Sequence, residues 1–360
     1  VPWSTAGLAL DPDGLPPAIA AQCPHLAGHL ALRLDPAQVP AEQALRGQVV
    51  LSIHLHSGRL VTAGSLQVPH VIDQVYAAAA RATLGVTWCA GVPSLRLWAP
   101  TAQRVRLLLW PAGASLHDPP AGHVMARDSD GVWLATGAPD WLAARYLFEV
   151  TVYTPHHRRV VSNRVTDPYS TALTVNSTHS VIVDLDAPEL VVPGWVAAPS
   201  PALPHPVDQV IYELHVRDFS ISDKSVPPQL RGTFLAFTAD SAGMAHLRGL
   251  AQAGLTSVQL LPVFDNASVE EHPDQQTLPP KHRLKEFPPD SDQQQREVLA
   301  TATVNGYNWG YDPWHYLASE GSFSSSLETA EGAGRVTEFR AMVGALHAAG
   351  LRVVLDMVFN

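Results

Sequence analysis

The sequence predicts a multidomain protein in which two β-rich units are followed by a parallel α/β unit. Two observations lead to this fold class. Up to about residue 186, short runs of alternating hydrophobic and polar residues are separated by turn signals, which is typical of antiparallel β-domains. From about residue 207, continuous apolar runs alternate with segments of helical hydrophobic spacing, which is typical of parallel strands joined by helices.

The first unit, residues 1–83, is predicted to be a small N-terminal β-domain with a connecting helix. Its apolar runs, such as residues 48–53 and 59–62, have the length of short strands. Residues 71–83 have a helical composition, and we expect them to form the connecting helix.

The second unit, residues 84–186, is predicted to be a β-sandwich. Residues 94–98 and 104–110 alternate, and residues 145–153 form a longer alternating run that we expect to be a long strand. Residues 187–206 are rich in proline and are expected to form a linker.

The third unit, residues 207–360, changes to a strand and helix alternation. The apolar runs at 209–216, 255–263 and 351–359 are expected to be buried strands. Residues 241–254 and 337–350 have helical spacing, and each segment ends in a glycine that is typical of a helix C-terminus. This pattern predicts a parallel sheet but does not distinguish an open sheet from a closed barrel.

The composition argues against several classes of partner. The formal net charge is −10 and there is no run of five or six basic residues, so nucleic acid is a poor candidate. No run of 18 apolar residues is present, so no membrane span is expected. A neutral sugar polymer fits this composition. Cys23 and Cys89 match no metal-ligand spacing, and the sequence leaves open whether they form a disulfide.

Five segments in a fixed order carry a resemblance to a known family. Together they resemble the pullulanase and limit-dextrinase branch of the α-amylase clan. Residues 287–295 also resemble a long insertion of that branch. The heptapeptide YNWGYDP is the most specific of the five. The segments are WAPTA (98–102), IYELHVRDF (211–219), GLTSVQLLP (254–262), YNWGYDP (307–313) and GLRVVLDMVFN (350–360).

The resemblance implies a glycan-binding type of sandwich followed by a (β/α)8 barrel that this chain contains only as far as strand three. It also implies an α-1,6-debranching hydrolase that acts on pullulan, limit dextrins or branched α-glucan by a retaining mechanism. In the family the nucleophile, the acid and a stabilising carboxylate follow strands four, five and seven. We therefore expect no catalytic residue within these 360 residues, no activity of this polypeptide alone, and no required cofactor.

The resemblance assigns substrate-binding residues to two loops. Tyr311 is expected to stack on a sugar ring, since a flat aromatic face covers the apolar side of a pyranose. Asp312 is expected either to orient its loop or to reach a sugar hydroxyl, and Trp309 either to bind substrate or to pack within the loop. Asp356 lies in an otherwise apolar strand, and a buried carboxylate needs partners or solvent, which places it at the site. Asn360 is a weak candidate for a structural calcium ligand.

Several alternatives remain open at this point. Glu213, His215, Arg217 and Asp218 look catalytic, but the family's pattern favours a structural role at the start of the barrel. Trp98 and Trp133 could bind glucan or fill the sandwich core. The whole protein could instead be a non-catalytic glucan-binding protein or another enzyme of the α-amylase clan.

Overall fold

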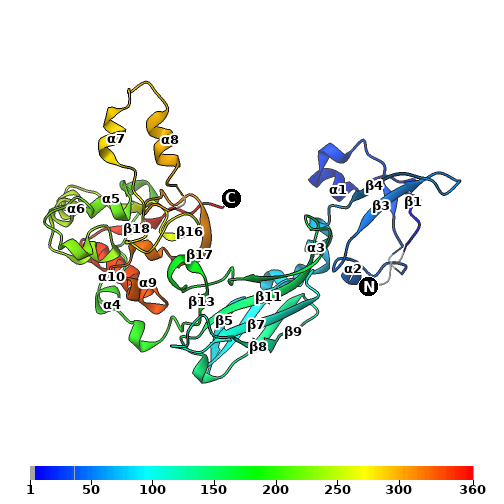
Figure 1. The fold of residues 1–360 in the computed structure, drawn as a ribbon, viewed down its shortest axis with the longest axis horizontal. Coiled ribbons are helices and arrows are strands. Elements are labelled where there is room, and N and C mark those ends of the chain that lie inside the picture. The colour runs from blue at the N-terminus through cyan, green and yellow to red at the C-terminus, as the bar shows by residue number, and fades with distance from the viewer. Residues whose placement is uncertain (1–4, 36, 303, 360) are drawn as a thin grey trace.

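The computed structural model describes residues 5–35, 37–302 and 304–359. Three parts follow one another along the chain (Figure 1): a small β-rich part that contains the N-terminus, a β-sandwich, and an α/β part that contains the C-terminus. The sandwich lies between the other two parts.

The N-terminal part consists of short two-stranded ribbons and short helices, and most of its side chains are exposed. A two-stranded ribbon without a second layer has little apolar surface to bury. The predicted connecting helix is interrupted at Tyr76, which is buried and accepts a 3.0 Å hydrogen bond on its hydroxyl from Arg127 of the sandwich. The elements are β1 (Ala9–Leu10), α1 (Pro17–Gln22), β2 (Leu32–Arg33), α2 (Ala41–Ala44), β3 (Val50–His54), β4 (Leu60–Ser65), α3 (Pro69–Val75) and the 3₁₀ helix η2 (Ala77–Arg81).

The middle part has two antiparallel sheets, with strand orders β5-β6-β10-β9 and β12-β11-β7-β8. Inward-facing side chains of both sheets form one core, in which Leu95, Leu107 and Phe148 are fully buried. β13 pairs with the start of β11. The strands are β5 (Gly85–Cys89), β6 (Val92–Trp98), β7 (Arg104–Trp110), β8 (Ala121–Val124), β9 (Ala126–Arg127), β10 (Val132–Thr136), β11 (Arg145–Thr154), β12 (Arg159–Val165) and β13 (Ser180–Val181).

The structure shows whether Trp98 and Trp133 lie in the sandwich core and whether the two cysteines form a disulfide. Trp133 is buried in the sandwich core and donates a 2.9 Å hydrogen bond to the Ala99 carbonyl, so it is a core residue. Trp98 lies at the end of β6 and is partly exposed. Cys23 and Cys89 are both free thiols.

In the described part of the α/β region, β14, β15 and β18 form a parallel sheet in that order. α6 and α10 pack their apolar side chains on it, with Leu247, Leu260 and Leu346 fully buried in a shared core. α4 of the proline-rich linker also packs against α10. The elements are α4 (Pro193–Ala197), β14 (Ile211–Leu214), α5 (Val216–Ser220), α6 (Ala242–Gln252), β15 (Ser257–Leu260), α9 (Leu327–Ala330), α10 (Ala333–Ala348) and β18 (Arg352–Leu355).

The strands are shorter than the apolar runs that predicted them. β14 ends before His215, because the His215 side chain caps α5 by accepting from the Asp218 N–H. β18 ends at Leu355, where its ladder with β15 ends at Leu260. Hydrophobicity continues beyond the hydrogen-bonded ladder in each case, so the apolar run overestimates the strand.

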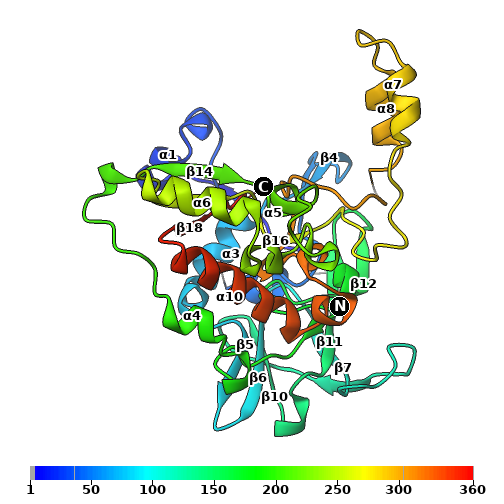
Figure 2. The ribbon, with the colours of Figure 1, turned by 90° about the vertical axis from the view of Figure 1, so that its left-hand side faces the viewer.

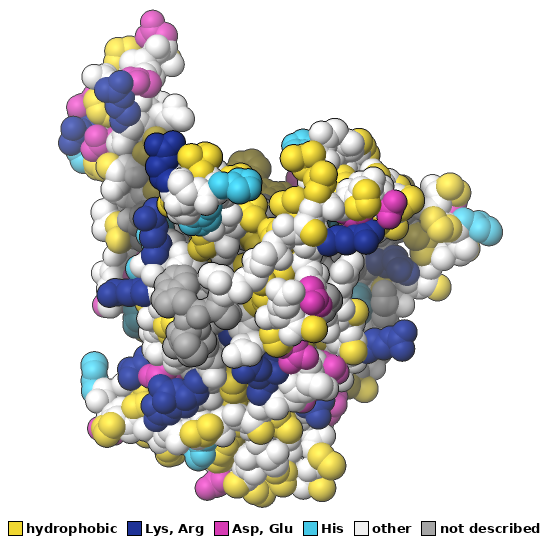
Figure 3. Space-filling view, turned by 90° about the vertical axis from the view of Figure 1, so that its right-hand side faces the viewer, with side chains coloured by type: hydrophobic (Ala, Val, Ile, Leu, Met, Phe, Trp, Pro, Cys, Tyr) yellow, Lys and Arg dark blue, Asp and Glu magenta, His cyan; other side chains and the backbone are white. Residues whose placement is uncertain are grey.

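A long excursion separates β15 from α10. An antiparallel pair, β16 and β17, lies beside the parallel sheet, and between these strands the chain extends into a helical hairpin that projects from the body (Figures 1 and 2). On the face shown in Figure 3, basic and acidic side chains are interspersed with hydrophobic ones, including on the projecting lobe. The elements are β16 (Phe264–Asn266), α7 (Lys281–Glu286), α8 (Gln293–Leu299) and β17 (Pro313–Ser319).

Within the described ranges, no helix combines the length and the apolar character that a membrane crossing requires.

Candidate functional site

The structure brings Tyr311 and Asp356 into direct contact. Tyr311 lies in the loop before β17, and Asp356 directly follows β18. The Tyr311 hydroxyl donates a 2.7 Å hydrogen bond to Asp356 Oδ2. This bond to a carboxylate raises the pKa of Tyr311 to about 12, because loss of the phenol proton would break the bond and place two negative charges together. Tyr311 as a whole residue is 41% exposed, so the contact of its hydroxyl with Asp356 does not bury it.

The backbone of the Tyr311 loop requires glycine at position 310. Gly310 has a φ of +93°, and a Cβ there would lie 2.7 Å from the Cβ of Pro262 and 2.9 Å from its carbonyl oxygen. The loop thus packs directly against the chain that leaves β15. The Gly310 N–H donates to Asn308 Oδ1 at 2.7 Å, which closes a tight turn immediately before Tyr311.

His215 supports this turn from the end of β14. Its Nε2 donates a 2.8 Å hydrogen bond to the Asn308 carbonyl. His215 is 6% exposed, and burial lowers the pKa of its imidazole, which favours the neutral ring. The structural role expected for His215 is therefore a specific one: it joins the first parallel strand to the loop that carries Tyr311.

Asp312 forms hydrogen bonds with residues 267 and 268. Its Oδ2 accepts a hydrogen bond from the Ser268 hydroxyl, and its carbonyl accepts a 3.0 Å bond from the Ala267 N–H. The Ser268 hydroxyl also accepts a 2.8 Å bond from Asn308 Nδ2. Among the described residues, Asp312 Oδ1 has no hydrogen-bond partner. One carboxylate oxygen orients the loop, and contact of the other with a sugar hydroxyl stays a prediction.

Two further residues, Trp309 and Asn360, were predicted to belong to the site. Trp309 is 57% exposed, so more than half of its surface is uncovered, and its role in substrate binding stays a prediction. Asn360, the weak candidate for calcium, lies outside the described residues.

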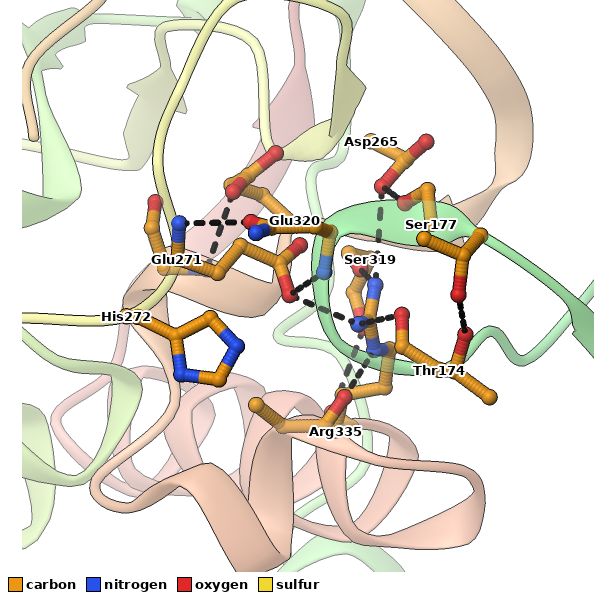
Figure 4. Close-up of polar contacts among 12 residues, drawn as sticks. Thr174, Ser177, Asp265, Glu271, His272, Ser319, Glu320 and Arg335 are labelled. Carbon is orange, nitrogen blue, oxygen red and sulfur yellow. Dashed lines mark hydrogen bonds and ion pairs between the residues drawn. The ribbon is translucent and has the colours of Figure 1, made fainter. Parts of the chain in front are cut away.

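The structure also contains a buried cluster of charged side chains that the sequence did not predict. Asp265, Glu271 and Glu320 each offer a carboxylate oxygen within 4.8 Å of the others (Figure 4). Arg335 of α10 is fully buried, and its guanidinium lies 3.3 Å from Glu271 Oε2 and 3.6 Å from Asp265 Oδ1. A guanidinium therefore already supplies positive charge to these carboxylates. We call these four residues the acidic cluster.

The acidic cluster contains three carboxyl groups and one guanidinium, so Arg335 alone cannot neutralise all three carboxylates. Burial, together with the neighbouring Glu271 and Asp265 carboxylates, raises the pKa of Glu320 to about 8. Burial also raises the pKa of Glu271, against the opposing effect of Arg335. The cluster is therefore expected to hold a proton at neutral pH.

The acidic cluster also ties the antiparallel pair to the sandwich. His315 Nδ1 donates a 2.7 Å hydrogen bond to Asp265 Oδ2, and its Nε2 lies 2.7 Å from the Thr166 hydroxyl at the end of the sandwich strands. The sequence signal for the cluster is weak: Asp265 directly follows the apolar run of residues 260–264, whereas Glu320 is preceded by Ser319.

The chain is similar to known proteins along nearly all of its length. A family profile described as the pullulanase N2 domain matches residues 4–74, and carbohydrate-binding module 48, the isoamylase N-terminal domain, matches residues 83–170. Pullulanase 1, chloroplastic, of Arabidopsis thaliana is 34% identical over 98% of this chain, and a Klebsiella pneumoniae pullulanase is 34% identical over 98% of it. These matches cover 36% and 35% of the two relatives, so the chain spans about a third of their length.

Solved structures give the same result. The apo pullulanase of Klebsiella pneumoniae superposes with a TM-score of 0.87 at 33% identity, over 98% of this chain and 41% of that one. A Klebsiella pneumoniae pullulanase complexed with maltotriose superposes with a TM-score of 0.87 at 33% identity, over 98% of this chain and 36% of that one. The homologues and the structural neighbours of this chain along nearly all of its length are thus pullulanases, in agreement with the resemblance that its motifs carry.

Proposed function

We propose that residues 1–360 are part of an α-1,6-debranching hydrolase that acts on pullulan, limit dextrins or branched α-glucan by a retaining mechanism. In this proposal β14, β15 and β18 are the first three strands of a (β/α)8 barrel. Similarity to pullulanases supports the reaction, and the parallel order of these strands is compatible with the barrel.

The observation that carries the proposal is the hydrogen bond between Tyr311 and Asp356. Both residues lie beyond the carboxyl end of a parallel strand, Asp356 after β18 and Tyr311 in the excursion that follows β15. In a (β/α)8 enzyme this edge of the sheet carries the active site. The pair therefore has the position expected for a substrate-binding site.

The chemistry assigned to these residues is binding and orientation. Tyr311 offers an aromatic face on which the apolar side of a pyranose can stack, and Asp356 fixes the ring by holding its hydroxyl. Retaining hydrolysis also needs a carboxylate nucleophile and a carboxylic acid on either side of the scissile bond, and it needs no cofactor. We propose that both catalytic carboxyl groups lie outside residues 1–360, as the family's strand positions imply.

The test compares Tyr311→Ala with Tyr311→Phe in the full-length polypeptide, with pullulan as substrate. Loss of the ring is expected to lower kcat/KM by about ten-fold or more, whereas Phe keeps the stacking face and is expected to retain most of the activity. Thermal unfolding of each variant controls for folding. An unchanged kcat/KM in Tyr311→Ala would remove Tyr311 from the site.

A second test uses the polypeptide of residues 1–360 by itself. We expect a pure preparation to release no reducing sugar from pullulan, because the nucleophile and the acid supply most of the rate. Release of reducing sugar above the level of a mock purification would show that the catalytic carboxyl groups lie within these residues.

The partner proposed for this chain is an α-glucan. A non-catalytic glucan-binding protein is the alternative, since the match to carbohydrate-binding module 48 would also suit that role. The two are separated by whether the full-length polypeptide hydrolyses pullulan at all.

A further inference from the structure

The loop of residues 174–178, which we call the clasp loop, joins the sandwich to the acidic cluster. It lies between β12 and β13, and Figure 4 shows Thr174 and Ser177 facing Asp265 and Arg335. Asn176 and Ser177 both have left-handed backbones, with φ of 54° and 52°. Two successive non-glycine residues in this region cost free energy, and such strain persists only where surrounding contacts enforce it.

The enforcing contacts are hydrogen bonds from the clasp loop to the segment of residues 265–271. The Asn176 backbone N–H donates to Glu271 Oε2, its Nδ2 donates to Glu270 Oε1, and its Oδ1 accepts from the Glu271 N–H, each at 2.8 Å. The Ser177 hydroxyl donates to Asp265 Oδ1. Asn176 therefore uses its backbone donor and both ends of its amide on two neighbouring residues, which fixes that segment closely.

The same segment holds the Tyr311 loop. Two residues before Glu270, Ser268 contacts Asp312 and Asn308 on either side of Tyr311. The Glu270 N–H donates a 3.0 Å bond to the Asn305 carbonyl. Both sides of the segment are thus occupied, one by the clasp loop and the other by residues 305–312.

We propose that Asn176 is a positioning residue for the substrate-binding loop: through residues 265–271, the clasp loop of the sandwich sets the place of Tyr311. The sandwich then contributes to the geometry of the site and not only to attachment to glucan. The assignment of Tyr311 to sugar binding rests on the proposed function, whereas the mechanical connection from Asn176 to residues 305–312 does not.

A different contact between the same two parts provides the control. Arg145 of β11 and Glu331, just before α10, form an ion pair of 2.6 Å. Among the described contacts, the Glu331 side chain has no hydrogen bond to residues 265–271 or 305–312. Glu331→Gln therefore weakens the junction between sandwich and α/β part without touching the connection to Tyr311.

The experiment measures hydrogen exchange by mass spectrometry in the full-length polypeptide. Asn176→Gly removes the side-chain bonds but keeps the backbone N–H, and glycine accepts a φ of 54°. We expect exchange in residues 265–271 and 305–313 to become several-fold faster in Asn176→Gly and to stay unchanged in Glu331→Gln. Unchanged exchange in Asn176→Gly, or equal acceleration in both variants, would overturn the proposal.

A double-mutant cycle on pullulan hydrolysis then tests whether Asn176 acts through Tyr311. Asn176→Gly alone is expected to lower kcat/KM by about three- to ten-fold, and to cause little further loss in a Tyr311→Ala background. Losses that multiply would show that Asn176 acts elsewhere and would contradict the proposal. If no variant or parent hydrolyses pullulan, the proposed function fails, while the exchange measurement still decides the role of Asn176.

Discussion

Arg335 is a cation buried completely from solvent, and its neighbours explain how the fold tolerates it. Its Nε donates to the Ala330 carbonyl at 2.6 Å and Nη1 to the Ser319 carbonyl at 3.0 Å. Its Nη2 reaches both the Thr174 carbonyl and Glu271 at 3.3 Å. Such a group costs much desolvation energy, so its removal leaves the facing carboxylates uncompensated.

Replacing Arg335 with methionine is predicted to lower the free energy of unfolding by about 3–5 kcal/mol at neutral pH. The loss should be smaller at acidic pH, because the carboxyl groups of the acidic cluster then take up protons and no longer repel one another. The pKa of Glu320, already raised to about 8, makes the sign clear: its folded form binds a proton that the unfolded chain releases above about pH 4.5. Stability from this group is thus lost as pH rises from about 4.5 to 8. Arg335 lowers the pKa of Glu271, so without Arg335 the Glu271 carboxyl group is expected to add to this pH dependence.

Urea unfolding at pH 5.5, 7.0 and 8.5 measures this prediction. Arg340→Met is the matched control, because Arg340 lies on the same helix and donates to the Leu190 and Leu185 carbonyls at 2.9 and 3.0 Å without touching the acidic cluster. Its loss should be nearly independent of pH. The same pH dependence in both variants would show that the acidic cluster does not titrate as described.

At the scale of elements, the excursion between β15 and α10 brings a loop back across the strand ends. At Gly310 it passes so close to Pro262 that an added Cβ would lie 2.7 Å from the Pro262 Cβ. Because the obstructing atoms include a proline ring carbon and a backbone carbonyl oxygen, neither can move aside without shifting the chain that leaves β15.

Gly310→Ala is therefore predicted to destabilise the protein by more than Gly254→Ala. Both glycines have positive φ, +93° and +110°, so both alanines suffer the backbone penalty of about 1–2 kcal/mol. A Cβ at Gly254 meets no atom within 4 Å, whereas one at Gly310 meets Pro262. Thermal and urea unfolding give the difference, and equal losses would mean that the Tyr311 loop does not pack on Pro262.

At the scale of the whole molecule, the proline-rich linker packs against the α/β part through its helix α4. α4 packs on α10 so closely that a Cβ on Gly344 would lie 2.6 Å from the Gly194 carbonyl carbon and 2.7 Å from the Trp195 nitrogen. Arg340 adds hydrogen bonds to two carbonyls on either side of the linker's start. The sandwich and the α/β part therefore share an interface through α4 as well as through the clasp loop.

Alanine substitutions at two helix glycines distinguish the effect of helix propensity on stability from the effect of the packing between α4 and α10. Gly249→Ala in α6 is predicted to stabilise the protein by up to about 1 kcal/mol, because the site is open and alanine favours the helix. Gly344→Ala in α10 is predicted to destabilise it despite the same propensity gain, because α4 must move away. Unfolding free energies of the two variants decide the matter, and stabilisation by both would show that α4 is not held against α10.

The sequence by itself determined the features that depend on local patterns. Alternating residues predicted β11, and helical spacing predicted α6 and α10, because each pattern reflects which face of a single element is buried. The motifs gave the resemblance to pullulanases, and from it Tyr311 and Asp356 were predicted to share a site, since the ends of parallel strands lie at one edge of a sheet. The structure shows these two residues in contact, and their binding of sugar stays a prediction. Strand lengths were overestimated, because hydrophobicity does not mark where a hydrogen-bonded ladder ends.

Only the tertiary structure decided which distant polar groups meet. Asn176 and Glu271 are hydrogen-bonded although they lie 95 positions apart in the sequence, and Arg335 is bonded to Glu271 over a separation of 64 positions. Nothing in the local sequence of an isolated arginine or asparagine shows that it will be buried, because burial depends on which loops and helices pack above it. A charge enters the interior only where opposite charges and hydrogen-bond partners arrive from other segments, and that arrangement exists only after the segments have packed together.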